Sequence, residues 1–521
     1  MKRFFLILIL TVTTFIVVAE KPNIIIILAD DLDADEINYT SEMHDVWATH
    51  TGASVRGLWS KDCNPRVLTP HIDSLAKNGM LFERFYVNGT VCSSSRYTLL
   101  TGRYATNGED LLRDYPVGTH ATLEWRPWIL RSESSLPKEL KRLGYTTGII
   151  GKWHNGESDL SEKSIRKAMK VERKANPTLD EMEAIEKSIS ERYELLREGL
   201  LNGFGWDVVD RMEWGNSIVN LDWQCEGALN FIESNQSRPF FLYCALPVPH
   251  GQYRFDYNQI ESYDRSVTSA GILDTKMELL PSVSNILERC KKANVPRVNA
   301  MATHMDDYIG KIIMSLEKLD LRDNTLIIFT SDHGSRGKNS VYEGGAKVPM
   351  IITWPKVVEA GSLSDSLIGS VDIASTLLEI ASGSIFDNRG MDGHSFKWQL
   401  IGEDEPNDWR KTLLIEAGNT KGVVSRDWKY IANRVTKEVA VKMKMRPHEV
   451  YWTGYDHHNY QNESMYPTFW EADQFFDLKE DLYEQDNLIS NVQYSTYVRM
   501  MKDELSSHVK DLPHTFGEFG K

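Results

Sequence analysis

The sequence predicts an α/β protein with a large, mostly parallel central sheet flanked by helices, followed by a small C-terminal α+β domain with a short antiparallel sheet. Short runs of β-branched or aromatic residues, each long enough for one buried strand, alternate with helical patterns between residues 23 and 330. Beyond residue 405 the pattern changes to short, closely spaced strands and one final helix. These two observations indicate two domains, at residues 20–405 and 406–521.

The individual elements follow from the same patterns. Strands of the large sheet are expected at residues 23–28, 146–150, 240–246 and 325–330, and helices at 135–143 and 300–319. A polar stretch at 403–408 separates them from expected strands at 412–416, 422–425 and 428–431 and a helix at 498–509. The highly charged stretch at 157–201 predicts a solvated helical excursion, with a lid over the substrate as the alternative.

The first 19 residues have the pattern of a secretory signal peptide. Lys2 and Arg3 precede an apolar run that ends in the small residue Ala19. An uncleaved membrane anchor is the alternative, although the run is short for one. No later segment is apolar for long enough to span a bilayer, so we expect no stable membrane insertion. The sequence predicts an exported protein, periplasmic or secreted, with bacterial export favoured.

The net charge restricts the classes of binding partner, and the cysteine content restricts the possible disulfides. The formal net charge is −15, which argues against nucleic acid and requires that any anion site be built locally by basic groups, metal or helix ends. There are 5 cysteines, an odd number in a compartment that permits disulfides. If Cys92 is consumed chemically, four remain, and their pairing stays open.

Polar side chains that could act in catalysis or bind a metal follow each of the four predicted strands of the large sheet. In open α/β sheets, ligands bind beyond the carboxyl ends of the strands. One such ending could be chance, but four that converge on one edge describe an active site. The residues at these ends are Asp30 and Asp31, Lys152 and His154, His250, and Asp332 and His333.

Residues 91–103 are the most informative stretch. Cys92 precedes three serines and a helical pattern, which predicts a thiol at a helix N-terminus, where free N–H groups bind anions and lower a thiol pKa. Arg96 is one turn further on and can face the same ligand. The residues alone allow a cysteine nucleophile or a phosphate-type anion site.

This stretch resembles the sulfatase signature, Cys-x-Pro-Ser-Arg followed by Leu-Thr-Gly-Arg, with Ser94 in the position of the proline. Other segments resemble sulfatase motifs in family order along nearly the whole chain: residues 23–31, 69–75, 151–154, 203–206, 249–250, 331–334, 342–345, 371–377 and 476–488. The resemblance implies an alkaline-phosphatase-like fold and hydrolysis of sulfate esters. Ser94 bears on how efficiently a maturation enzyme acts on Cys92.

The resemblance also implies a cofactor and a modified residue. Asp30, Asp31, Asp332 and His333, together with position 92, would hold one divalent cation, and the carboxylate oxygens favour Ca²⁺ over Mg²⁺ or Mn²⁺. A formylglycine-generating enzyme would convert Cys92 to formylglycine (3-oxoalanine). One hydroxyl of its hydrated gem-diol would attack sulfur and displace the alcohol, leaving a sulfo-enzyme intermediate. The second hydroxyl would then lose its proton and expel inorganic sulfate, which restores the aldehyde.

The remaining roles are carried over by position. Lys152 and Lys338 would bind sulfate oxygens, and His154 would orient and deprotonate the attacking hydroxyl. His250 would contact sulfate and, with Lys338, assist protonation of the leaving group. Lys338 is placed by its spacing before residues 342–345, and a surface lysine is the alternative. Two sets are expected to be structural: Glu343, Lys347, Asp306, Asp372 and His394 as anchors, caps or core hydrogen-bonding groups, and Tyr97 and Trp153 as packing residues.

Export, size and long inserted loops favour a sulfated carbohydrate as substrate, by analogy. A phosphodiesterase or phosphonate monoester hydrolase on the same fold is the enzymatic alternative. A non-catalytic glycan-binding protein is the alternative from another class, and loss of the nucleophile or of metal ligands would favour it.

Overall fold

The structure is a computed structural model that describes residues 21–38, 67–123, 125–155, 179–213, 219–250, 267–384, 390–453 and 462–519. The predicted signal peptide, Cys63 and residues 157–178 of the predicted helical excursion lie outside these ranges. Among the described residues, no helix is both long and apolar enough to cross a membrane.

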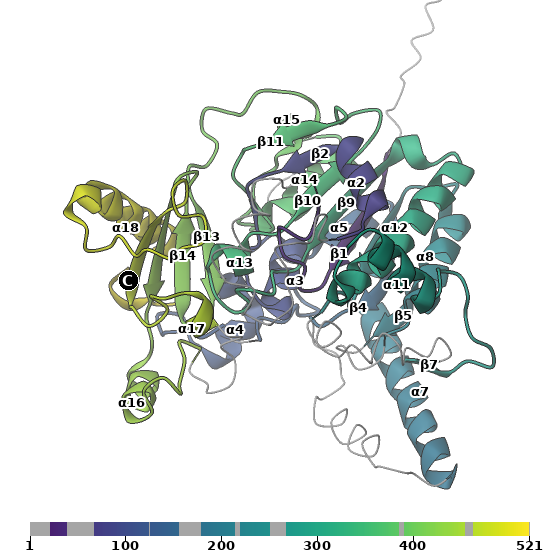
Figure 1. The fold of residues 1–521 in the computed structure, drawn as a ribbon, viewed down its shortest axis with the longest axis horizontal. Coiled ribbons are helices and arrows are strands. Elements are labelled where there is room, and N and C mark those ends of the chain that lie inside the picture. Colours follow the sequence, from purple (N-terminus) through teal and green to yellow (C-terminus); the bar gives the residue numbers. More distant parts are fainter. Residues whose placement is uncertain are drawn as a thin grey trace, which may run out of the picture.

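An eight-stranded sheet forms the centre of the large domain (Figure 1). Its strand order is β11-β2-β10-β9-β1-β6-β4-β5. Strand β10 is antiparallel to both of its neighbours, and every other adjacent pair is parallel. The prediction of a mostly parallel α/β sheet is therefore confirmed. The strands are β1 (Asn23–Ala29), β2 (Met80–Phe82), β4 (Thr146–Lys152), β5 (Val208–Glu213), β6 (Phe240–Ala245), β9 (Thr325–Ser331), β10 (Met350–Thr353) and β11 (Ser362–Ser364).

Helices cover both faces of this sheet, so its central strands are buried on both sides. In β1, Ile24 and Ile26 point into one apolar core, and Ile25 and Ile27 point into the other, as the two-residue period of a strand requires. The first core is formed with α3 (Cys92–Thr101), α5 (Leu136–Arg142) and α14 (Val371–Ser382). The second core is formed with α2 (Pro70–Lys77), α8 (Leu221–Asn235), α11 (Val283–Lys292) and α12 (Ala300–Lys318).

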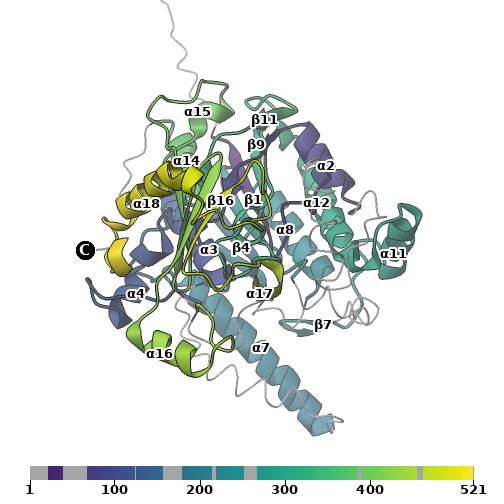
Figure 2. The same ribbon diagram turned by 60° about the vertical axis from the view of Figure 1, so that its left-hand side comes forward.

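A four-stranded antiparallel sheet forms the C-terminal part, in the order β13-β14-β15-β16 (Figure 2). One face packs on the long helix α18 (Ser495–Val509), and the other contributes to a core with Tyr86, Val341 and Tyr342 of the large domain. The strands are β13 (Leu413–Ala417), β14 (Thr420–Val424), β15 (Trp428–Asn433) and β16 (Asp473–Asp477). The predicted small antiparallel sheet is confirmed, whereas the domain boundary at 405/406 stays a prediction.

The longest of the remaining elements is α7 (Leu179–Leu201), which projects from the body of the molecule (Figure 1). The others are β3 (Phe85–Tyr86) paired with β12 (Ile368–Gly369), the hairpin β7 (Val267–Thr268) and β8 (Gly271–Ile272), and the helices α4 (Glu109–Asp114), α13 (Glu343–Ala346), α15 (Lys397–Leu400), α16 (Lys437–Met445) and α17 (Asn462–Met465).

The predicted elements agree with the observed ones to within three residues at each end. The four strands of the large sheet begin at the predicted residues, and β4 continues two residues further, through Lys152. Strand β16 was not among the predicted strands. It lies far along the chain from β15, its partner, and pairs from Trp428–Asp477 to Ala432–Asp473.

Candidate active site

The carboxyl ends of β9, β1, β6 and β4 lie side by side, because these four strands are adjacent in the sheet and parallel. Backbone hydrogen bonds join the turns that follow them: the N–H of Asp332 donates to the carbonyl of Ala29 at 3.0 Å, and the N–H of Asp30 donates to that of Val248 at 3.1 Å. The four polar strand ends predicted from the sequence therefore meet at one edge.

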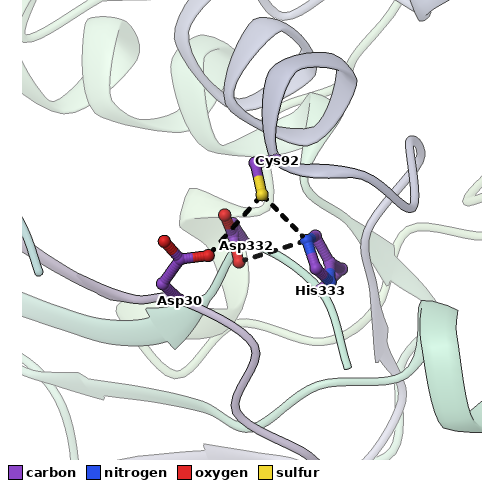
Figure 3. Close-up of side chains that lie close together, drawn as sticks. All are labelled: Asp30, Cys92, Asp332 and His333. Atoms are coloured by element: carbon purple, nitrogen blue, oxygen red, sulfur yellow. Dashed lines mark hydrogen bonds and ion pairs between the residues drawn. The ribbon is translucent and has the colours of Figure 1, made fainter. Parts of the chain in front are cut away.

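Cys92 is the first residue of α3 and faces this edge. The preceding Val91 is extended and provides no side-chain cap, so the helix N-terminus leaves backbone N–H groups without helical partners near the thiol. The Sγ atom lies 3.3 Å from Nε2 of His333 and 3.6 Å from Oδ1 of Asp30 (Figure 3). The predicted position of a thiol at a helix start, inside the site, is confirmed.

The acidic groups form a compact, buried set of donors. Ligand atoms of Asp30, Cys92, Asp332 and His333 all lie within 4.8 Å of one another (Figure 3). A second group of the same size joins Asp30 and Cys92 with Asp31 and His250. Asp31 also lies 3.2 Å from Nε2 of His333 and has a positive φ of 65°. All five predicted metal ligands are thus brought together.

Three cations surround these carboxylates. Arg96 donates from Nη2 to Asp332 at 2.9 Å, and from Nη1 to the carbonyl of Lys152 at 3.1 Å. Lys152 Nζ lies 2.5 Å from Asp30 and 3.6 Å from the Cys92 sulfur. The predicted alternative of a surface lysine is wrong for Lys338, which is 3% exposed because it pairs with the buried Asp31. Its Nζ lies 2.9 Å from Asp31 and 3.8 Å from the sulfur.

The two candidate catalytic histidines are partly exposed, unlike the charged groups behind them. His250 Nε2 lies 3.2 Å from Lys338 Nζ and 3.6 Å from Asp31. Burial, together with the charges of Lys152 and Arg96, lowers the pKa of His154 to about 3. Burial also lowers the pKa of His250 to about 4, although Asp31 opposes this shift. Both imidazoles are therefore neutral at neutral pH.

The charges also act on Cys92 and Asp30. Burial raises the pKa of the Cys92 thiol, but the charges of Lys152 and Lys338 outweigh burial and lower that pKa to about 7. Burial opposes ionisation of Asp30 as well, and Lys152 nevertheless holds its pKa well below the usual range. The site is built to hold negative charge at residue 92.

A bulge near the end of β4 helps to position Lys152 and His154 in the site. The register with β5 shifts between Ile150 and Gly151, and Gly151 has a φ of 93°. A Cβ atom at this position would lie 2.1 Å from the carbonyl oxygen of Ala245. The glycine is required here for both its backbone conformation and its close approach to β6.

Ser94, the departure from the signature, fits the helix without cost. It is the third residue of α3, and its hydroxyl donates to the carbonyl of Val91 at 3.2 Å. Because the first N–H groups of a helix have no helical acceptor, neither serine nor proline loses a helical hydrogen bond at this position. Ser94 packs tightly on Gly89, where an added Cβ would lie 2.6 Å from its hydroxyl.

The residues expected to be structural have structural partners. Asp306 accepts from the N–H groups of His71 and Ile72, and Asp372 accepts from that of His394 and pairs with Arg410. Glu343 accepts from the Tyr86 hydroxyl, and Lys347 lies 3.9 Å from Glu343. Tyr97 donates to Glu133, and Trp153 packs among aromatic rings.

One residue of the site was missed. Trp125 lies 6.0 Å from Lys338 Nζ and 6.1 Å from the His154 ring, measured from its ring centre. It belongs to an irregular loop far along the chain from both, and no motif or periodicity there points to the site.

Comparison with known proteins decides the family. A model of the sulfatase family matches residues 22–384, which include all of the site residues. The chain belongs to the sulfatase family. A model of the C-terminal region of N-sulphoglucosamine sulphohydrolase matches residues 331–511. The predicted resemblance, and with it a sulfuric ester hydrolase, is confirmed.

Several curated relatives of this sulfatase are carbohydrate sulfatases by name. The ulvan-active sulfatase of Formosa agariphila is 26% identical over 504 residues, covering 94% of this chain and 80% of that enzyme. The N-acetylgalactosamine-6-sulfatase of Mus musculus is 26% identical over 427 residues, covering 72% of this chain and 65% of that enzyme. The chain thus spans about two thirds of the mouse enzyme's length.

Solved structures share the fold of this sulfatase. The PsFucS1 sulfatase from Pseudoalteromonas sp. aligns with a TM-score of 0.56 at 20% identity, covering 94% of this chain and 90% of that one. The phosphonate monoester hydrolase SpPMH from Silicibacter pomeroyi aligns with a TM-score of 0.53 at 16% identity, covering 94% and 95%. The predicted alkaline-phosphatase-like architecture is confirmed.

Proposed function

We propose that this protein hydrolyses sulfate esters of a carbohydrate, with Cys92 converted to formylglycine as the nucleophile and one divalent cation in the acidic cluster. The observation that carries the proposal is the surroundings of Cys92. Its side chain lies within 3.8 Å of two lysines, a carboxylate and an imidazole. A modified side chain here would face both a cation site and groups that bind an anion.

The donor set fits a hard divalent cation. Asp30, Asp31 and Asp332 offer carboxylate oxygens and His333 offers one nitrogen, all buried at the same edge of the sheet. Oxygen-rich sets of this kind favour Ca²⁺ over softer metals. When bound, the cation would supply positive charge that polarises oxygen ligands. Converted to formylglycine by a maturation enzyme, residue 92 would supply the nucleophilic hydroxyl.

The residues of the chain divide the remaining work. Lys152 and Lys338 flank residue 92 and would hold the sulfate oxygens while negative charge develops on them. Arg96 donates a hydrogen bond to Asp332 and so keeps that carboxylate in place. The neutral imidazole of His154 would accept a proton from the attacking hydroxyl. Lys338 would deliver a proton towards the leaving group, and His250 at 3.2 Å would orient it.

The carbohydrate substrate rests on the named activities of the relatives. The relative from Formosa agariphila supports a bacterial protein, and the apolar run behind Lys2 and Arg3 supports export with a signal peptide at residues 1–19. We also propose the division into residues 20–405 and 406–521.

Sulfate release tests the proposed function. The protein is co-produced with a formylglycine-generating enzyme and incubated with sulfated mono- and oligosaccharides, an aryl sulfate and an aryl phosphodiester. We expect sulfate release from at least one sugar and a larger kcat/KM for sulfate esters than for the phosphodiester. The variant Cys92→Ala should release none. Faster turnover of the phosphodiester would overturn the proposal in favour of a phosphodiesterase.

A further inference from the structure

Trp125 stands where the substrate must leave the buried site. Lys152, Arg96 and Lys338 are each at most 3% exposed. His154 and His250, in contrast, are partly exposed, and so is Trp125. Its ring lies 6.1 Å from that of His154 and 6.0 Å from Lys338 Nζ. An ester whose sulfate lies between the lysines would have to extend towards these partly exposed side chains, and Trp125 is one of them.

The loop that carries Trp125 is held in place at both ends. A turn is closed by the N–H of Arg126, which donates to the carbonyl of Leu123 at 2.7 Å. After the turn, the Arg126 side chain donates to Asp110 at 2.7 Å. Further on, Asn155 accepts from the N–H of Ile129 at 2.9 Å and donates to the carbonyl of Ser93 in α3. The loop is thus tied through Asn155 to the helix that begins at Cys92.

The C-terminal sheet holds the other side of the same loop. The N–H of Leu123 donates to the carbonyl of Gly418, in the turn between β13 and β14, at 3.1 Å. The next residue, Asn419, accepts from the Thr122 hydroxyl at 2.7 Å and lies 2.7 Å from Nε2 of His120. Its own side-chain amide donates to the carbonyl of Trp452 at 2.8 Å. The loop that carries the indole is therefore held at residues on both sides of Trp125 before any substrate arrives.

We infer that Trp125 is a specificity-determining wall of the carbohydrate site, against which the sugar ring that carries the sulfate packs. This inference rests on the proposed function. An aromatic side chain gives a large, rigid apolar surface that suits the C–H face of a pyranose, and Lys338 and His154 lie beside it to bind polar groups. Asn419, in the turn between β13 and β14, helps to hold the loop that carries Trp125.

The alternative role for Trp125 is to orient Lys338 by a cation–π contact. The two roles differ in their effect on inorganic sulfate, which needs only the buried cations and does not reach the indole. The variants Trp125→Ala and Trp125→Phe are therefore compared with wild type by KM and kcat on the best substrate of the sugar panel and by Ki for inorganic sulfate. Trp128→Ala, on the same loop and 40% exposed, is the matched control.

We expect Trp125→Ala to raise KM by about tenfold, the equivalent of about 1.4 kcal/mol, with Ki for sulfate unchanged. Trp125→Phe should restore most of the loss, and Trp128→Ala should behave as wild type. A rise in Ki together with a fall in kcat would overturn the inference, because Trp125 would then act on Lys338. Sulfate release from an aryl sulfate but from no sugar would also overturn it, whereas failure to release sulfate from any ester contradicts the proposed function instead.

Discussion

At the scale of single residues, the charges around Cys92 balance. Asp30, Asp31 and Asp332 face Arg96, Lys152 and Lys338, all buried. Each carboxylate has a cation within 2.9 Å, which compensates for removal of its charge from water. A divalent cation would attract the carboxylates and leave the lysines free for an anion. Metal and sulfate should therefore favour each other's binding.

Calcium should raise the melting temperature of the protein, because the ion binds the folded donor set and not the unfolded chain. At a calcium concentration of 100 times Kd the gain is about 2.7 kcal/mol. Differential scanning calorimetry with calcium or with a chelator measures it. Asp332→Asn should lose most of the gain. An equal gain in wild type and variant would contradict binding of calcium at this cluster.

Prediction from sequence succeeded for residues whose position in the chain fixes their position in space. Asp30 and Asp332 directly follow strands, so the parallel sheet brings them together. The role of Lys338 was predicted from its spacing before residues 342–345. Trp125 was missed because its neighbours Lys338 and His154 are remote in the chain, and only the tertiary contacts of its loop bring them together.

At the scale of elements, the end of β4 requires a glycine at position 151. Gly151→Ala would place a Cβ atom 2.1 Å from the Ala245 carbonyl oxygen. The end of β4 must then move, and Lys152 and His154 move with it. Since misplacement by about 1 Å can cost about 100-fold in rate, we expect a loss of that order in kcat.

Gly144→Ala is the matched control for Gly151→Ala. Gly144 has a φ of 88°, close to that of Gly151, but nothing lies within 4 Å of an added Cβ. This variant should lose some stability and keep its kcat. Equal kcat in the two variants, from sulfate-release kinetics, would show that the contact with β6 does not position the site.

The start of α2 depends on a side chain from another helix. Thr69, before the helix, makes no capping bond, and Asp306 of α12 accepts from the first N–H groups instead. Burial raises the pKa of Asp306 to about 8. The folded protein therefore holds a proton that the unfolded chain loses at about pH 4, and stability falls as the pH rises between these values.

Asp306→Asn should remove this pH dependence, because the amide keeps an acceptor and cannot ionise. We expect the melting temperature of wild type to fall relative to that of the variant from about pH 4 to about pH 8, and the difference to level off above. Thermal unfolding of both proteins across this range measures it. A difference that is constant with pH would contradict the raised pKa.

At the scale of the whole molecule, a buried ion cluster joins the C-terminal sheet to the large domain. Lys429 of β15 lies 2.6 Å from Glu343, at the start of α13, and 2.9 Å from Glu484. Glu484 also accepts from the N–H of Glu343 at 2.6 Å. Glu343 follows the loop that carries Lys338, so this cluster holds the C-terminal end of that loop.

Lys429→Met should destabilise the protein by about 3–5 kcal/mol, since it leaves the buried Glu484 without its cation and Glu343 with Lys347 alone, at 3.9 Å. Chemical denaturation gives the free energy of unfolding. Lys442→Met, which removes an exposed lysine paired with Glu438 at 2.8 Å, is the control and should behave as wild type. A loss no larger than that of the control would show that the cluster does not hold the two domains together.

The α/β layers of the large domain could be predicted because β1, β4, β6 and β9 each carry a clear apolar pattern, whereas β2, β5, β10 and β11 were not predicted. The arrangement of the C-terminal sheet on the large domain could not. It depends on β16 returning from far along the chain to pair with β15, and on buried ion pairs such as Lys429–Glu343. The motif at residues 476–488 does not say which strand β16 pairs with, and each partner of the ion pair alone looks like an ordinary polar residue.

The central claim, that Cys92 is the precursor of the nucleophile, is tested most directly by the mass of the peptide that contains residue 92. The protein is purified from its native source, digested and measured by mass spectrometry with an aldehyde-reactive probe as a second label. We predict a peptide in which an aldehyde has replaced the thiol and which reacts with the probe. An unmodified cysteine in protein that releases sulfate would contradict the proposed mechanism.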